Sequence, residues 1–166
     1  MWQSSSLVEQ LDKARRYTLT LIDSVPESQW FQFPHEGVTH VAWQVGHLAV
    51  VEYRLVLERR RGVRPGDEEL LPEAFGQLFG KGSTPVVDPA LSPSVTEIRR
   101  VLDNVHQKAL SELVETSAEV FAEPVSAPHP MFSDKGAAVQ WCAMHEMFHT
   151  GEIALLRRLL GHAPLR

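Results

Sequence analysis

The stretch 134–161, DKGAAVQWCAMHEMFHTGEIALLRRLLG, predicts one long helix near the end of the chain. Ser133 or Asp134 is suited to cap its first turn, because both side chains accept hydrogen bonds from the free backbone N–H groups there. Gly161 suits the position after the last turn, where a positive φ is common. Inside this segment, HEMFH at 145–149 places two histidines four residues apart, so that both side chains lie on one face of the helix.

Three further segments have apolar residues at spacings of three and four, which is the pattern of an amphipathic helix. With the C-terminal segment, the predicted helices span 6–25, 39–60, 93–118 and 134–160. No run shows the alternation that is typical of a strand. Ser6 with Glu9 forms a candidate capping box for the first helix, and Thr39 and Ser92 are candidate N-caps for the next two.

The connector between the second and third helices, residues 61–92, holds five of the ten glycines and four of the eleven prolines. It has room for one short helix at about 72–78, and Phe75 and Phe79 are expected to fold back onto the core. Helices of roughly 20 residues with such a connector indicate an all-α fold, a four-helix bundle with a long crossover between helices two and three. We expect a single domain, 1–166.

The composition argues against several classes of function. The net charge is −5 and the basic residues form only short runs, so nucleic acid is not expected as a partner. Cys142 is the only cysteine, which rules out a disulfide within the chain. The first residues lack an apolar signal-peptide core, and no apolar run approaches the ~18 residues of a membrane span. We therefore expect a cytoplasmic protein with no membrane association.

The pattern H-E-x-x-H is typical of zinc proteases, in which two histidines bind the ion and the glutamate is the base. Such proteases need a third ligand further along the chain. Glu152 and Leu155 stand where one class requires glycine and histidine. Only the 17 residues 150–166 follow His149, which leaves no room for another helix that carries a glutamate ligand. The sequence therefore argues against a protease.

A helix bundle supplies metal ligands from facing helices, and His47 in the second predicted helix is the best third candidate. Gly46 beside it leaves room for another helix to approach closely. Three imidazoles, from His47, His145 and His149, would leave one position on the ion open, as in catalytic zinc sites. His40 lies seven residues earlier, about 10.5 Å along the helix axis, so we exclude it as a ligand and expect it at the rim of the site.

Two motifs in this order, WQVGHLA at 43–49 and HEMFHTGEIALLRRLLG at 145–161, resemble those of the DinB-like (DinB/YfiT) superfamily of metal-dependent enzymes. The opening helix, PESQW at 26–30 and the loop-rich crossover also agree, so the resemblance extends over nearly the whole chain. It implies a four-helix bundle that binds a divalent ion, commonly zinc or nickel, and that forms a homodimer. By resemblance, the metal ligands are the three histidines of these motifs, His47, His145 and His149.

Two other polar residues, Glu146 and Glu152, have two interpretations each. Glu146 is either a solvent-facing carboxylate or a general base that activates a water on the metal. Glu152 stands where the family usually has glutamine, in H-x-G-Q; it either accepts the second ring N–H of a ligand histidine or pairs with Arg15 or Arg16. His106, on the third predicted helix, is expected at the surface.

The leading hypothesis is a metal-dependent thiol S-transferase or hydrolase that acts on a small molecule. The resemblance implies the thiol chemistry, because some relatives transfer low-molecular-weight thiols to electrophiles. The alternative is a non-catalytic metal-binding or ligand-sensing bundle, in which the ion mainly holds two helices together.

Overall fold

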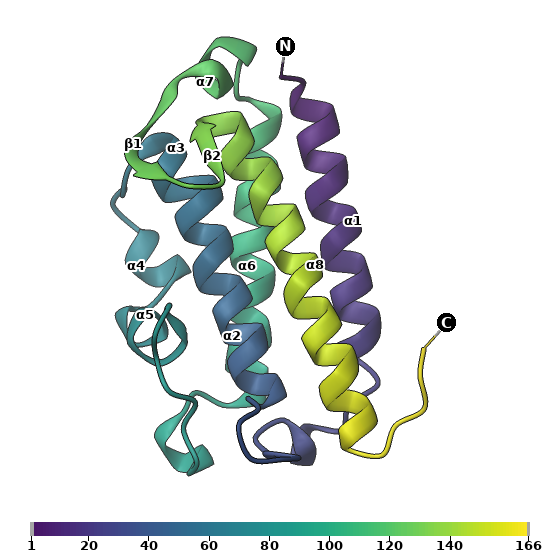
Figure 1. Ribbon diagram of the computed structural model, residues 1–166. Helices are drawn as coiled ribbons and strands as arrows, with labels where there is room; N and C mark the ends of the chain where they lie inside the picture. Colours follow the sequence, from purple (N-terminus) through teal and green to yellow (C-terminus); the bar gives the residue numbers. More distant parts are fainter. Residues whose placement is uncertain (1, 166) are drawn as a thin grey trace.

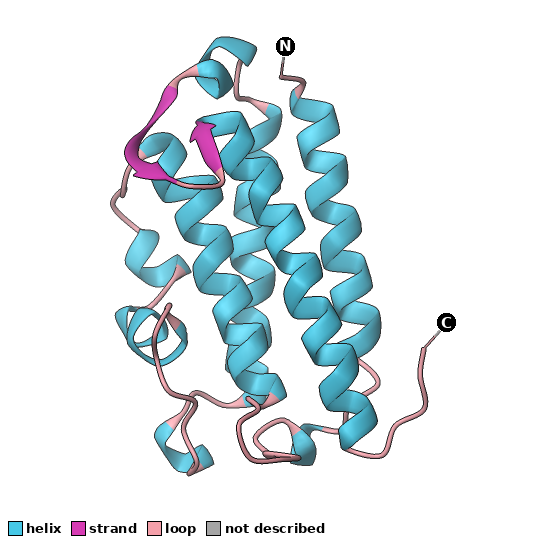
Figure 2. Cartoon of the chain, in the orientation of Figure 1, coloured by secondary structure: helices cyan, strands magenta, loops and turns pink. Residues whose placement is uncertain are grey.

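The computed structural model describes residues 2–165, and four long helices packed side by side form the body of the fold (Figures 1 and 2). They are α1 (Ser4–Ile22), α2 (Val41–Glu52), α6 (Val95–Val114) and α8 (Lys135–Leu159). From α2 the chain continues through a wide π-helical segment, η2 (Tyr53–Glu58), into α3 (Arg59–Arg61). The predicted all-α four-helix bundle is confirmed.

The order of the helices around the bundle explains the long crossover. α1 packs against α8 and α6, and α2 packs against the same two helices, so α1 and α2 occupy opposite corners. In Figure 1, α2 and α6 both run upward, whereas α1 and α8 run downward. Because α2 and α6 are parallel neighbours, the chain must return along the full length of the bundle between them.

The crossover folds against α2 instead of extending into solvent. It contains α4 (Asp67–Leu70), α5 (Glu73–Phe79) and a 3₁₀ turn, η3 (Pro89–Leu91). The short helix predicted at about 72–78 is therefore confirmed as α5. Phe75 and Phe79 are each only 1% exposed and belong to the core, also as predicted.

α5 approaches the backbone of α2 at Gly46. A Cβ atom built on Gly46 would lie 2.4 Å from Cγ of Phe79, which is closer than any ordinary carbon contact. The sequence predicted that Gly46 leaves room for a neighbouring helix. The helix that approaches is α5, and the ring of its Phe79 packs against Gly46. Glycine is therefore needed here for its lack of a side chain and not for its φ angle.

Two predicted N-caps are wrong by one or two residues. His40, and not Thr39, caps α2, because the Nδ1 atom of His40 accepts a hydrogen bond from the backbone N–H of Trp43 at 3.0 Å. Ser94, and not Ser92, caps α6. A histidine cap is hard to predict because serine, threonine, aspartate and asparagine dominate this position.

The capping box at Ser6 is also wrong. α1 begins two residues earlier, with Gln3 at the cap and no side-chain hydrogen bond to the first turn. Both ends of α8 agree with the prediction. Asp134 caps the first turn by accepting from the N–H of Ala137 at 2.7 Å, and Gly161 has a φ of +93° after the last turn.

A short hairpin between α6 and α8 was not predicted. After α7 (Ala118–Ala122), the strands β1 (Pro124–His129) and β2 (Phe132–Asp134) pair antiparallel at one end of the bundle (Figure 2). The prediction that no segment of the chain forms a strand is therefore wrong. Prolines in β1 hide the strand pattern, since proline in a strand is confined to edges and irregular positions.

The apolar stripes of the four long helices meet in one core. Side chains from α1, α6 and α8 that contribute to it include Leu11, Leu21, Ile98, Leu102 and Ile153, all fully buried. None of the helices within residues 2–165 combines the length and apolar character needed to cross a bilayer.

The contact between Gly46 and Phe79 leads to the first prediction. Gly46→Ala should lower the free energy of unfolding by about 1–3 kcal/mol, because the new methyl group overlaps the Phe79 ring. Urea unfolding followed by circular dichroism measures this change. Gly151→Ala in α8 is the matched control: nothing lies within 4 Å of its Cβ position, so it should stabilise the protein by roughly 0.5–1 kcal/mol. Equal effects of the two substitutions would contradict the proposed steric role of Gly46.

Candidate metal centre

Three histidines from two helices lie together. His47 comes from α2 and His145 and His149 from α8, and one ring nitrogen of each lies within 4.8 Å of the others. Within residues 2–165, no cysteine or carboxylate joins this group. His40 is not a member of it, in agreement with the sequence prediction. The structure thus brings together the three residues that the sequence identified as candidate ligands.

The spacing of the α8 pair suits a tetrahedral ion. The Nε2 atoms of His145 and His149 are 3.3 Å apart. Imidazole nitrogens bind zinc at about 2.0–2.1 Å, and two such ligands at a tetrahedral angle lie roughly 3.3 Å from each other. The separation of these two nitrogens therefore equals the one that such an ion requires.

Hydrogen bonds on the outer side of the rings determine which nitrogen faces the centre. The Nδ1 atom of His47 lies 2.7 Å from the carbonyl oxygen of Phe79. A carbonyl only accepts hydrogen bonds, so Nδ1 must carry the proton and donate it. Nε2 of the neutral ring then keeps a free lone pair, which is the form that a metal ion binds.

Gln44 has the same effect on His149. Its Nε2 atom donates to Oε2 of Glu152 at 2.5 Å and to Oγ1 of Thr39 at 2.7 Å. Because an ionised carboxylate only accepts, this contact fixes the orientation of the amide, and Oε1 must face His149. Nδ1 of His149 donates to that oxygen at 2.5 Å, which leaves its Nε2 free for an ion.

The sequence patterns did not single out Gln44 as a residue of the site. Glu152 lies further from His149 than predicted. Glu152 reaches His149 through Gln44 and not by direct contact, and it pairs with neither Arg15 nor Arg16. One signal was present in the sequence: Gln44 is the only polar residue besides His47 between positions 41 and 50, and it lies one turn before that histidine.

His145 lacks an outer partner. Its Nδ1 atom is buried and makes no hydrogen bond within residues 2–165, while its Nε2 faces Nε2 of His149. Two lone pairs at this distance repel each other, so either a proton or a cation must lie between the two nitrogens. The donor set therefore fits a cation, with two of the three rings oriented in advance.

The site favours neutral imidazoles. Burial, and then the positive charge of the neighbouring histidines, lower the pKa of His149 to about 3 and that of His145 to about 4. Burial also lowers the pKa of His47. Protons therefore compete weakly with a metal ion at neutral pH, since only the neutral ring is a ligand.

One aromatic side chain, Trp43, packs directly on the site. Trp43 stacks on the ring of His47 with a centroid distance of 4.8 Å and an interplanar angle of 9°, and its Nε1 donates to Oγ of Ser83. On α8, the rings of Trp141 and Phe148 are 5.9 Å apart, and Phe148 is 61% exposed. Phe148 is thus a surface residue, whereas Trp43 is half-buried beside His47.

Glu146 lies in a different environment from the histidines. It is 2% exposed, so the interpretation as a solvent-facing carboxylate is wrong. Its Oε1 accepts from Nε of Arg15 and from Oγ1 of Thr18, both at 2.8 Å, and its Oε2 accepts from Arg15 at 3.2 Å. These contacts occupy both oxygens on the side of α8 that packs against α1. The role of general base has no support from this geometry.

His106 belongs to the same buried network, so its expected surface position is also wrong. It is 3% exposed, and its Nδ1 donates to Glu52 at 2.8 Å, while Glu52 also accepts from Arg15 at 2.8 Å. Burial alone would raise the pKa of Glu52, but the charges of Arg15 and His106 outweigh it and the pKa is lowered. Two buried carboxylates thus share one arginine across the core.

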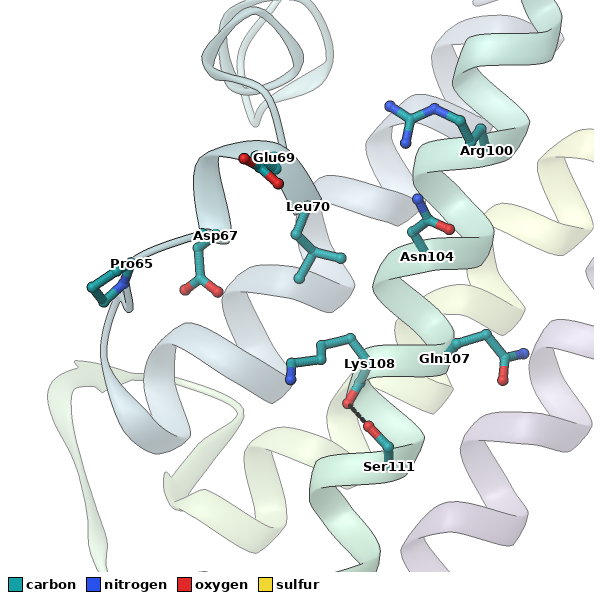
Figure 3. A pocket seen from close by; sticks show the side chains of 10 residues that line it. Pro65, Asp67, Glu69, Leu70, Arg100, Asn104, Gln107, Lys108 and Ser111 are labelled. Carbon is teal, nitrogen blue, oxygen red and sulfur yellow. Dashed lines mark hydrogen bonds between the residues drawn. The ribbon is translucent and has the colours of Figure 1, made fainter.

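A polar groove lies elsewhere on the surface, between α4 and α6 (Figure 3). Its volume is about 820 Å³, and none of the three histidines lines it. Acidic and basic side chains both contribute, including Asp67, Glu69, Arg100 and Lys108. Asp67 is already held by Arg61 and by Tyr53. The groove therefore shows no set of free groups that converge on one ligand.

Comparison with known proteins identifies the family of the chain. The model of the DinB superfamily matches residues 10–153, and the chain therefore belongs to that superfamily. Among solved structures, YfiT from Bacillus subtilis, described as a probable metal-dependent hydrolase with an unusual four-helix bundle topology, matches with a TM-score of 0.65. The match covers 97% of this chain and 89% of YfiT at 18% sequence identity. No curated protein matches the chain significantly.

The contacts of Gln44 lead to the second prediction. Gln44→Ala should weaken zinc binding by about 10–100-fold, because Nδ1 of His149 loses the acceptor that orients its ring. Competition with a chromophoric chelator measures the affinity. Gln140→Ala, on the exposed face of α8, is the control and should leave the affinity unchanged. The same affinity in both variants would contradict the orienting role of Gln44.

The position of Glu146 leads to the third prediction. Glu146→Gln should lower the free energy of unfolding by about 3 kcal/mol, because Arg15 stays buried with one of its two charged partners removed. Bound metal should stay at one ion per chain. Glu9→Gln, which removes an exposed carboxylate paired with Lys13, is the control and should unfold like the wild type. A Glu146→Gln variant of unchanged stability would contradict the structural role.

Proposed function

We propose that the chain binds a divalent metal ion, zinc or nickel, through His47, His145 and His149, and uses it to transform a small molecule. The observation that carries the proposal is the convergence of three imidazoles from two helices, two of them oriented by partners on the outer side. Membership in the DinB superfamily supports it, as does the fold shared with a protein described as a probable metal-dependent hydrolase.

A divalent ion held by three neutral imidazoles would supply Lewis acidity and lower the pKa of a coordinating water or thiol. The chain's own thiol is a poor nucleophile for such a reaction. Cys142 is 3% exposed, and burial raises the pKa of its thiol well above the usual value. Thiol S-transfer, the first of the two proposed reactions, would therefore use a low-molecular-weight thiol as a substrate. Hydrolysis is the second.

A separate experiment tests whether Glu146 is the general base for hydrolysis. If it were the base, Glu146→Gln would reduce turnover per folded molecule by at least ~100-fold. We propose the structural role instead, because Arg15 and Thr18 already engage both oxygens of this carboxylate.

The alternative function is a non-catalytic metal-binding or ligand-sensing bundle. It is favoured by one feature, namely that the three histidines connect α2 to α8, so that a bound ion would hold these helices together. In that case the free energy of metal binding contributes directly to folding.

We also propose a cytoplasmic location, a single domain and a homodimer, with no nucleic acid or membrane partner. The dimer is supported by exposed apolar side chains along α8 beside α1, where Tyr17, Met144 and Met147 line a shallow apolar groove of about 400 Å³. The net charge of −5 supports the absence of nucleic acid.

Substitution of one ligand tests the metal centre and separates the two functions. His149→Ala should abolish the stoichiometric binding of zinc or nickel, measured by elemental analysis of protein purified without an affinity tag. For a catalytic centre, the variant should keep its fold and lose turnover. A large loss of thermal stability, equal to that of chelator-treated wild type, would support the structural alternative. One ion per chain in His149→Ala would refute the ligand assignment.

A further inference from the structure

One arginine near the histidines has no partner. Arg54, at the second position of η2, is exposed, and its guanidinium makes no hydrogen bond or ion pair within residues 2–165. Two other arginines of the same helical run differ, because Arg60 and Arg61 both bind Glu112. An arginine without a carboxylate partner is common at a surface, so its significance depends on where the guanidinium lies.

Arg54 lies on nearly the same face of the helix as His47. The two residues are seven apart, which corresponds to about 10.5 Å along the axis and almost two full turns. Side chains on a helix lean toward its N-terminus, so the side chain of Arg54 extends back toward His47. Arg54 itself belongs to the π-helical segment η2, and such segments are frequent at functional sites.

The contacts of the guanidinium confirm this direction. Its Nη2 and Nη1 atoms lie 3.6 Å from the Cβ positions of Gly76 and Gly80, respectively. These glycines lie on either side of Phe79 in the sequence. The carbonyl oxygen of Phe79 accepts a hydrogen bond from Nδ1 of His47. The charge of Arg54 therefore lies beside the segment that holds a candidate metal ligand.

This placement has an electrostatic consequence. Three neutral imidazoles do nothing to neutralise a divalent ion, and Glu152, the nearby carboxylate that binds Gln44, offsets only one of the ion's two charges. With an ion in place, this region would carry an excess of positive charge, which favours an anion as the next ligand.

We infer that Arg54 recognises the substrate and that the substrate carries an oxyanion, a carboxylate or a phosphate, in addition to the group that approaches the metal. A guanidinium presents two parallel N–H donors, which match the geometry of both kinds of oxyanion. The inference deepens the proposed function and rests on it, because the metal centre and Arg54 together define the substrate class.

The test uses cobalt-loaded protein, with binding of three small thiols followed by visible absorption. The probes are 3-mercaptopropionate, 2-mercaptoethylphosphonate and the uncharged 2-mercaptoethanol. Each probe is compared between wild type and Arg54→Gln, so differences in thiol acidity between probes cancel. Arg54→Gln should raise the Kd of both anionic probes roughly tenfold and that of mercaptoethanol less than twofold. The larger of the two anionic effects identifies the preferred oxyanion.

Arg158→Gln is the matched control. Arg158 is an exposed arginine on α8 that also has no carboxylate partner within residues 2–165, and it lies more than two turns beyond His149. Its removal changes the net charge equally and should leave all three Kd values unchanged. Equal effects of Arg54→Gln on the three probes, or no effect, would overturn the inference while the metal centre stands. Failure of the wild type to bind cobalt would overturn both.

Discussion

The centre depends on two hydrogen bonds that face away from it. The carbonyl oxygen of Phe79 accepts a hydrogen bond from Nδ1 of His47, and Oε1 of Gln44 accepts one from Nδ1 of His149. Each bond fixes a tautomer, so the lone pairs of both rings face the space between α2 and α8. The first bond requires α5 to lie close to α2, and only glycine at position 46 permits that approach. The long crossover is therefore part of the site and not merely a connection between helices.

α8 carries two polar systems. His145 and His149 face α2 with free nitrogens, whereas Glu146 faces α1 and is fully engaged by Arg15 and Thr18. The adjacent residues His145 and Glu146 thus lie in different environments, one at the candidate metal centre and one in a buried ion-pair network. A buried network of this kind stabilises the fold only while it is complete, since removal of one partner leaves an unpaired charge. It holds α1 against the helix that supplies two candidate ligands.

Local patterns were sufficient to predict the four helices, the fold of α5 onto the core and the three histidines that converge. Long amphipathic stripes and histidines four residues apart depend on local geometry alone. Gln44, the burial of His106 and the pairing of Glu146 were not predictable in this way, because their partners lie on other helices. His40 and the hairpin at 124–134 were missed because their residue types are unusual for a cap and for strands.

X-ray absorption at the zinc edge tests the central claim most directly, with protein purified without an affinity tag and loaded with zinc. The account predicts one ion per chain, with three imidazole nitrogens at about 2.0–2.1 Å and one exchangeable oxygen ligand from water. A spectrum with a sulfur ligand, or with fewer than three imidazoles around the ion, would contradict it.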